Sequence, residues 1–264
     1  MDNRAIGVFD SGFGGLTVMK QLEAVLPGES LIYFGDTGRA PYGGRPRETL
    51  LQFGRENIEF LLGFDVKLII AACGTVSAVG LPLLRGSYDV PLFGIIDSGA
   101  KAAAGATSSG RLGIIATQAS ILSGAYQSAV MEIDKQLYIK SVACPKFVPL
   151  VESGRFRPEV QEVRDAVSEH LSELRSAKID TLLLGCTHYP ILAQAIQEYM
   201  GSGVTLIDAG AAAAMQLRDY LCMHGLQCGE GAAQNTQYYT SGSSEAFNAT
   251  AGLIFGKQLR AIEI

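Results

Sequence analysis

Two cysteines in matching surroundings are the residues of this chain best suited to chemistry. Cys73 lies in the stretch IIAACGT (69–75) and Cys186 in LLLGCTH (182–188), each after a short apolar run. One such cysteine alone is most often an inert buried residue, but packing does not call for a matched pair. A turn that leads from a strand into a helix N-terminus lowers the pKa of a thiol and attracts an anion. The pattern therefore predicts two reactive thiols beside a carboxylate-bearing molecule.

Three kinds of chemistry use a pair of thiols. A zinc site needs three or four ligands, and only His188 lies close to either cysteine in sequence. A redox pair is normally closer in sequence, as in CxxC. Inversion of a stereocentre by deprotonation needs one base on each face of the carbon, and a thiol with an ordinary pKa of about 8.5 can act in both protonation states. The pair therefore favours racemisation and no metal.

Each thiol needs a neighbour that promotes its ionisation, since only a few per cent is thiolate at neutral pH. His188 stands two residues after Cys186, and Asp10 ends the first apolar run in DSGFGG. Asp10 is equally suited to cap a helix, and the two roles are compatible. The run Gly12-Phe13-Gly14-Gly15 does not match a nucleotide-binding pattern, so it indicates a tight turn that lets a small ligand approach the backbone.

Short, nearly continuous apolar runs predict strands that are buried on both faces. The predicted strands are Ala5–Phe9, Leu31–Phe34, Lys67–Ala72, Pro91–Ile96, Leu112–Ala116, Tyr138–Val142, Thr181–Leu184 and Val204–Ile207. Helical stretches separate most of them, and the clearest is Pro158–Arg175, with a proline suited to a first turn. Strands that alternate with helices predict a mainly parallel α/β arrangement.

The first four strands can be laid over the last four. Two strand starts are 107 residues apart (5 to 112 and 31 to 138), the cysteines 113 and GIIDSGA and TLIDAGA 111. We therefore expect an α/β protein of two pseudo-symmetric domains, each a mainly parallel sheet flanked by helices, with the active site in the cleft between them. The predicted domains are 1–97 with 207–264, which makes the first discontinuous, and 98–206.

Composition excludes several classes of protein. The chain has 264 residues with 48% hydrophobic and 18% charged residues, as in a folded domain pair. A net charge of −5 gives no electrostatic basis for binding nucleic acid. The polar start and the lack of a run of roughly 20 apolar residues predict a cytoplasmic protein with no membrane association. Five cysteines without a CxxC pair argue against a disulfide framework.

Several motifs together resemble the glutamate racemases, which supply D-glutamate for bacterial peptidoglycan. The resemblance runs in family order across almost the whole chain, and LGCTHYP is the most specific of its motifs. The matching stretches are FDSGFGGLTV (9–18), YFGDTGRAPYG (33–43), ACGT (72–75), IATQAS with SGAY (115–126), LVESG (150–154), LGCTHYPIL (184–192) and YTSG (239–242).

The resemblance implies roles for individual residues. Cys73 and Cys186 match the two catalytic cysteines, of which the first takes the proton from D-glutamate and the second from L-glutamate. Asp10, His188 and Glu152 match the groups that assist them. The positions implied to bind substrate are Asp10, Ser11, Tyr42, Gly43, Gly74, Thr75, Thr117, Thr187 and His188. The resemblance also implies glutamate as the substrate, no cofactor and a homodimer.

Some positions depart from the family pattern. Gly74 stands where asparagine is common, and Ser120 and Ala209 stand where threonine and serine are usual. A missing amide at position 74 removes a polar contact worth about 1 kcal/mol, and we expect it to widen the pocket. Two alternatives to a glutamate racemase therefore stay open: a racemase for aspartate or a related amino acid, and a non-catalytic small-molecule-binding relative.

Overall fold

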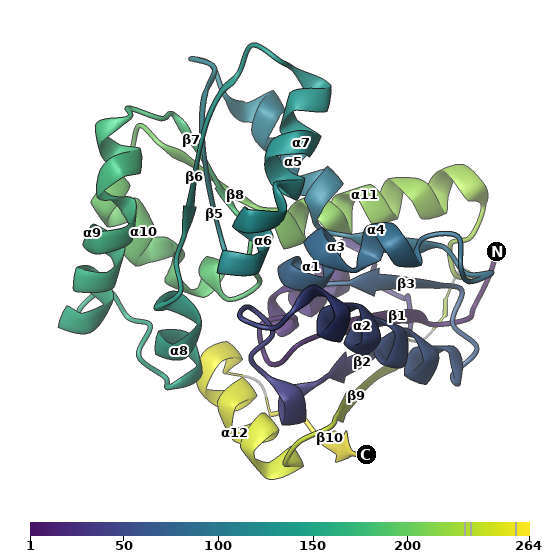
Figure 1. The fold of residues 1–264 in the computed structure, drawn as a ribbon. Coiled ribbons are helices and arrows are strands. Elements are labelled where there is room, and N and C mark those ends of the chain that lie inside the picture. The colour runs from purple at the N-terminus through teal and green to yellow at the C-terminus, as the bar shows by residue number, and fades with distance from the viewer. Residues whose placement is uncertain (230, 233, 257) are drawn as a thin grey trace.

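A computed structural model of the chain describes all residues except 230, 233 and 257, and shows two parallel sheets with helices on their faces (Figure 1). In the described residues, the first sheet has six strands in the order β10-β9-β2-β1-β3-β4, and the second has four in the order β6-β5-β7-β8. The strands are β1 (Ile6–Asp10), β2 (Leu31–Gly35), β3 (Leu68–Ala71), β4 (Leu92–Gly94), β5 (Arg111–Ala116), β6 (Tyr138–Ala143), β7 (Thr181–Leu184), β8 (Thr205–Asp208), β9 (Thr236–Thr240) and β10 (Ala261–Glu263).

The helices cover the faces of both sheets and connect successive strands (Figure 1). The α-helices are α1 (Leu16–Val25), α2 (Arg47–Leu62), α3 (Gly74–Val79), α4 (Leu81–Leu84), α5 (Ile96–Ala106), α6 (Gln118–Ser123), α7 (Ala125–Ile133), α8 (Phe147–Glu152), α9 (Gln161–Ser176), α10 (Ala193–Met200), α11 (Ala209–His224) and α12 (Ser244–Phe255). Two short 3₁₀ helices are η1 (Thr37–Arg39) and η2 (Tyr189–Leu192).

The two sheets repeat the same strand order. In the first sheet β1 pairs with β2 and β3, and in the second β5 pairs with β6 and β7, all in parallel. The predicted fold, two α/β domains with mainly parallel sheets, is confirmed. The residue boundary at 206/207 stays a prediction, and it falls inside β8, which continues to Asp208.

The last quarter of the chain returns to the first sheet. β9 pairs with β2, and β10 extends the same edge. Between the sheets, α11 packs against α1 and α5 (Figure 1). The helix begins at Asp208, whose carboxylate accepts hydrogen bonds from the N–H groups of Gly210 (2.8 Å) and Ala211 (3.2 Å). An N-terminal cap of this kind satisfies backbone donors that the helix itself leaves free.

The predicted helix at 158–175 forms, but it starts later than expected. α9 begins at Gln161 and buries Val163, Val167 and Leu171 on one face. Pro158 was predicted in the first turn and lies before the helix instead. A turn closed by the N–H of Val160 on the carbonyl of Arg157 precedes α9. Helix ends depend on such local hydrogen bonds, which the apolar spacing does not reveal.

A buried ion pair holds the far edge of the first sheet, away from the carboxyl ends of its strands. The ammonium group of Lys67 contacts the carboxylate of Glu29, and both side chains are almost completely buried. Lys67 also donates hydrogen bonds of 2.8 Å to the carbonyl oxygens of Asp2 and Leu226. One side chain therefore ties the N-terminus, β3 and the segment after α11 together.

We expect Lys67→Met to lower the free energy of unfolding by about 3–5 kcal/mol, because it leaves a buried carboxylate without its partner. Denaturant unfolding followed by circular dichroism measures this change. Lys140→Met is the control, since the ion pair of Lys140 with Glu173 is largely exposed and worth at most about 1 kcal/mol. Equal losses for both variants would contradict the prediction.

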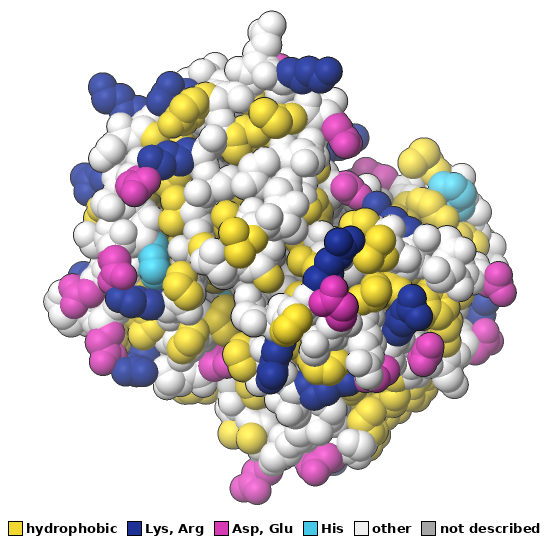
Figure 2. Space-filling model, viewed as in Figure 1, with side chains coloured by type: hydrophobic (Ala, Val, Ile, Leu, Met, Phe, Trp, Pro, Cys, Tyr) yellow, Lys and Arg dark blue, Asp and Glu magenta, His cyan; other side chains and the backbone are white. Residues whose placement is uncertain are grey.

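The surface carries charges of both signs. On the face drawn in Figure 2, Lys and Arg side chains lie interspersed with Asp and Glu over both domains. A mixed surface of this kind does not attract a polyanion as a clustered basic face would. Within the described part of the chain, no helix has both the length and the apolar character that crossing a membrane requires.

Candidate active site

A cavity of about 440 Å³ lies where the carboxyl ends of the strands of both sheets meet. Ser11 follows β1, Cys73 follows β3, Thr117 follows β5 and Cys186 follows β7, and all four line this cavity. Parallel α/β sheets bind their ligands at this edge because the loops after the strands converge there. The cavity therefore receives one thiol from each half of the molecule.

The cavity brings together all of the predicted site residues except Asp10. Those that line it are Ser11, Tyr42, Gly43, Cys73, Gly74, Thr75, Thr117, Glu152, Cys186, Thr187 and His188. Both halves contribute to this set. Thr75 and Thr117, one from each half, hydrogen-bond to each other at 2.9 Å between their hydroxyl oxygens.

Cys73 caps the N-terminus of α3, directly after β3. Its thiol donates a hydrogen bond to the hydroxyl of Ser11, with 3.6 Å between sulfur and oxygen. Burial, and then the negative charge of Asp10, raise the pKa of Cys73 to about 12, although the backbone N–H of Val76 acts in the opposite direction. Cys73 is therefore a protonated thiol at neutral pH, ready to donate a proton.

Cys186 has a different environment. Its sulfur lies 3.8 Å from Nδ1 of His188, and Nε2 of His188 lies 3.1 Å from a carboxylate oxygen of Glu152. Burial lowers the pKa of His188, but its hydrogen bonds with Cys186 and Glu152 outweigh burial and raise the pKa to about 10. A cationic imidazolium beside a sulfur atom stabilises negative charge on that sulfur. The geometry therefore favours Cys186 as the base.

Asp10 lies behind the cavity wall and is completely buried. Its carboxylate accepts hydrogen bonds from the N–H of Gly12 (3.0 Å) and the hydroxyl of Thr187 (3.2 Å). Burial raises the pKa of Asp10, while the charge of His188 acts in the opposite direction. The interpretation of Asp10 as a helix cap is wrong, because α1 is capped by Gly15 without a side chain. Asp10 instead links the first turn to the second half.

The charge on His188 predicts a pH dependence of stability. A pKa raised from 6.5 to about 10 gives stability that is fully present below pH 6.5 and is lost as the pH rises through 10. We therefore expect the difference in unfolding free energy between the unaltered protein and His188→Asn to shrink over this range. Denaturant titrations at intervals of pH measure it. A difference that grows with pH would show that His188 is neutral in the folded protein.

The glycines of the first turn serve contact between the two halves. A methyl group at Gly14 would lie 2.3 Å from Oγ1 of Thr187 and 2.5 Å from Nδ1 of His188. The turn was expected to admit a ligand to the backbone. The close neighbour of Gly14 is instead the Cys186 loop of the other half, and only a residue without a side chain fits there.

Gly74 makes a similar contact on the side of Cys73. A methyl group at this position would lie 2.4 Å from the carbonyl oxygen of Gly185. The expectation that the missing amide widens the pocket is therefore wrong, because the backbone of the other half occupies the space next to Gly74. The absence of a side chain brings the two thiol-bearing turns close together.

Several residues of the cavity were not predicted. They are Pro41, Gly44, Gln118, Cys144, Pro145, Val148, Pro149 and Tyr189. Cys144 was interpreted as ordinary packing, and it is indeed completely buried, but it also lines the cavity. Burial raises its pKa well above the ordinary value. Its position directly after β6, at the same sheet edge as the other loops, was the signal that could have revealed it.

A family model described as Asp/Glu/Hydantoin racemase matches residues 8–217. This range is more than half of the chain and contains every residue that lines the cavity. The fold and the site thus define a racemase of this class.

Individual relatives narrow the class. The chain is 41% identical to a glutamate racemase of Desulforudis audaxviator, over 98% of this chain and 96% of the relative. It is 43% identical to one of Lactococcus lactis subsp. lactis, over 95% and 92%. The chain belongs to the glutamate racemase family.

Solved structures agree with this assignment. A glutamate racemase isoform of Bacillus anthracis is 36% identical, with a TM-score of 0.95 over 100% of this chain and 98% of that chain. One from Francisella tularensis, solved in complex with D-glutamate, is 32% identical with a TM-score of 0.91 over the same shares. An aspartate racemase of Picrophilus torridus is 15% identical with a TM-score of 0.59, which shows the fold alone.

Proposed function

We propose that the protein interconverts L- and D-glutamate by moving the α-proton between Cys73 and Cys186, without a cofactor. The observation that carries this proposal is that one thiol from each half lines a single cavity. Further support comes from the Francisella tularensis relative, which was solved with D-glutamate. The alternative of aspartate is less well supported, since the aspartate racemase is similar in fold alone.

In the direction from L- to D-glutamate, Cys186 acts as the base. Its thiolate takes the α-proton, and the electron pair of the broken C–H bond stays on the α-carbon. The thiol of Cys73 then gives its proton to the opposite face, which leaves Cys73 as the thiolate and Cys186 as the thiol. The reverse reaction exchanges the two roles, so proton and charge balance in both directions.

Different neighbours assist the two thiols in this scheme. The imidazolium of His188, held by Glu152, stabilises the charge on Cys186. Asp10 lies near Cys73 and raises its pKa, so Cys73 is a proton donor in the free enzyme. Hydroxyl groups of Thr75, Thr117 and Thr187 also line the cavity. They supply fixed donors for the substrate carboxylates and for charge that develops on the carbanion.

Incubation with L-glutamate in D₂O tests this function. We expect loss of the α-proton by NMR together with loss of optical activity by circular dichroism. A response to aspartate alone would transfer the proposal to the sibling activity. No exchange with either amino acid would leave a binding protein and overturn the proposal.

The proposal also covers the setting of the activity. We infer that the enzyme supplies D-glutamate for peptidoglycan in the cytoplasm and acts as a homodimer. Leu83 and Leu122 support a dimer, since both are exposed and line one surface hollow beside Arg45 and Arg47. Sedimentation equilibrium of the unaltered protein and of Leu122→Glu, and depletion of the protein followed by measurement of D-glutamate in cell-wall precursors, test these statements.

A further inference from the structure

Residues 41–44 form the part of the cavity wall that the first half contributes from a loop. Pro41, Tyr42, Gly43 and Gly44 all line the cavity, between η1 and α2. The carbonyl of Gly43 accepts a hydrogen bond of 3.3 Å from the N–H of Ala119 in the second half. This wall segment therefore closes the cavity across the cleft, and a loop without regular structure needs something else to hold it.

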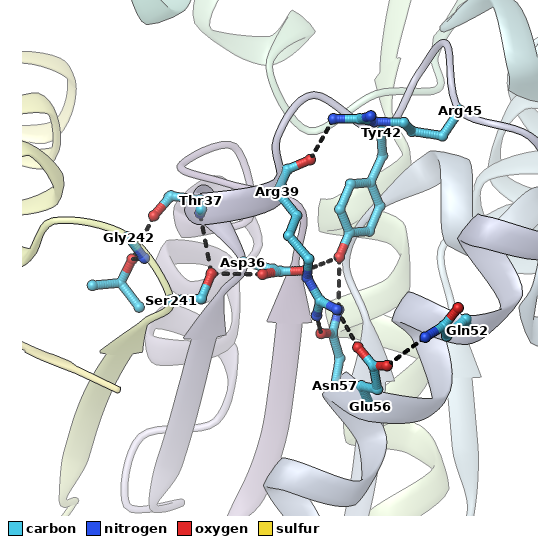
Figure 3. A network of polar contacts seen from close by, with 12 residues as sticks. Asp36, Thr37, Arg39, Tyr42, Arg45, Gln52, Glu56, Asn57, Ser241 and Gly242 are labelled. Atoms are coloured by element: carbon cyan, nitrogen blue, oxygen red, sulfur yellow. Dashed lines mark hydrogen bonds and ion pairs between the residues drawn. The ribbon is translucent and has the colours of Figure 1, made fainter.

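The side chain of Tyr42 provides that hold. Figure 3 shows its hydroxyl group directed at Asp36 and Asn57. The hydroxyl donates to the carboxylate of Asp36 and accepts from the amide of Asn57 at 3.2 Å. Burial, and then the charge of Asp36, raise the pKa of Tyr42, so the hydroxyl stays a donor throughout the neutral range. The three side chains are buried, with Asp36 and Asn57 completely so.

Asp36 is the centre of the network. Besides Tyr42, its carboxylate accepts hydrogen bonds from Nε of Arg39 (2.7 Å) and from the hydroxyl of Ser241 (2.6 Å). Arg39 also donates to the amide oxygen of Asn57 at 3.1 Å and contacts Glu56 (Figure 3). The network thus joins the end of β2, the buried face of α2 and the turn after β9. Buried polar networks with all partners satisfied hold one geometry firmly.

We propose that Asp36 and Asn57 are positioning residues which, through the hydroxyl of Tyr42, hold residues 41–44 in the geometry that binds substrate. The inference rests on the proposed glutamate racemase function. Neither residue lines the cavity, so each acts through Tyr42 rather than on substrate. Two stretches of the sequence, YFGDTGRAPYG and YTSG, supply this network and are thereby accounted for.

The proposal predicts a specific kinetic effect. A wall segment that is no longer held binds both enantiomers less well, whereas the thiols and their charged neighbours are unchanged. KM for L- and D-glutamate therefore rises by a similar factor, and kcat changes little. A role confined to stability would lower the melting temperature and the active fraction without changing KM.

Tyr42→Phe and Asn57→Leu test this, because each removes polar groups of the network while keeping the volume. We expect KM for both enantiomers to rise about 10-fold, the value for a lost hydrogen bond to a charged group or within its network, with kcat within about 3-fold. Gln52→Ala is the control: Gln52 lies on the same helix, at the exposed end of the network, bonded only to Glu56. It is expected to leave KM unchanged.

The double variant Tyr42→Phe/Asn57→Leu adds a second criterion. Residues that act through one network are not additive, so its KM should fall well short of the product of the two single effects. Unchanged KM in both single variants, or lower kcat and melting temperature at constant KM, would overturn the proposal. Calorimetric Kd values for D-glutamate are measured alongside. If the unaltered protein binds glutamate without turning it over, the racemase function fails while these Kd values still decide the role of the network.

Discussion

Cys73→Ser and Cys186→Ser are each expected to lower racemisation of glutamate by at least ~100-fold in both directions, as loss of a general acid–base group does. A serine hydroxyl is far too weak an acid to exchange a proton with the α-carbon at neutral pH. Both cysteines line the same cavity, yet neither can replace the other, because each faces one side of the substrate. Polarimetry or a coupled assay in each direction measures the loss.

The two variants are expected to differ in what they retain. Cys73→Ser keeps the base Cys186 with its His188 neighbour, so it still exchanges the α-proton of L-glutamate with D₂O without inverting it. Cys186→Ser keeps the opposite face and exchanges only D-glutamate. Cys144→Ser is the matched control, a third thiol in the same cavity that lies near neither Asp10 nor an imidazole partner in the printed contacts. Near-normal racemisation by either catalytic variant would remove that cysteine from the mechanism.

Gly74→Asn, the substitution that restores the common residue of the family, is expected to lower kcat by roughly 100-fold. Its Cβ atom would lie 2.4 Å from the carbonyl oxygen of Gly185, and that neighbour is backbone, which cannot rotate away. The turns that carry Cys73 and Cys186 must therefore separate, and a displacement of about 1 Å in the catalytic groups can cost this factor. Steady-state kinetics in both directions measures it, and Gly74→Ala is expected to act in the same direction.

Gly44→Ala is the control for this experiment. Gly44 lines the same cavity, but a methyl group there would meet nothing within 4 Å. It is expected to keep both kcat and the melting temperature. An active Gly74→Asn variant that binds glutamate more tightly than the unaltered protein would contradict the steric prediction. The missing amide, rather than the contact with Gly185, would then be what matters at this position.

Much of this architecture could be predicted because parallel strands buried on both faces form continuous apolar runs. The strands around Ile70 and Leu183, each followed by a cysteine, had such runs, and their equal spacing revealed the repeated topology. The position of the site followed from the rule that loops after parallel strands meet at one edge. Only the edge strand β10 and the exact ends of elements fell outside these patterns.

Other features depend on which backbone segments approach each other, and a single sequence does not contain that information. Gly74 differs from a glycine in an open loop only through its contact with Gly185. Asn57 is an ordinary polar residue within a helical stretch, and its link to Tyr42 exists only once α2 packs beside the loop. Cys144 was misinterpreted for the opposite reason, since burial and a place in the cavity occur together.

The unlike neighbours of the two sulfur atoms have a thermodynamic consequence. Mirror-image amino acids have the same free energy in water, so kcat/KM must be equal in the two directions. The free enzyme with a charged Cys73 is rare, because the pKa of Cys73 is about 12. A rare competent form weakens apparent affinity in proportion. D-glutamate must therefore combine a higher KM with a proportionately higher kcat, and the asymmetry of the site becomes a difference in saturation between the enantiomers.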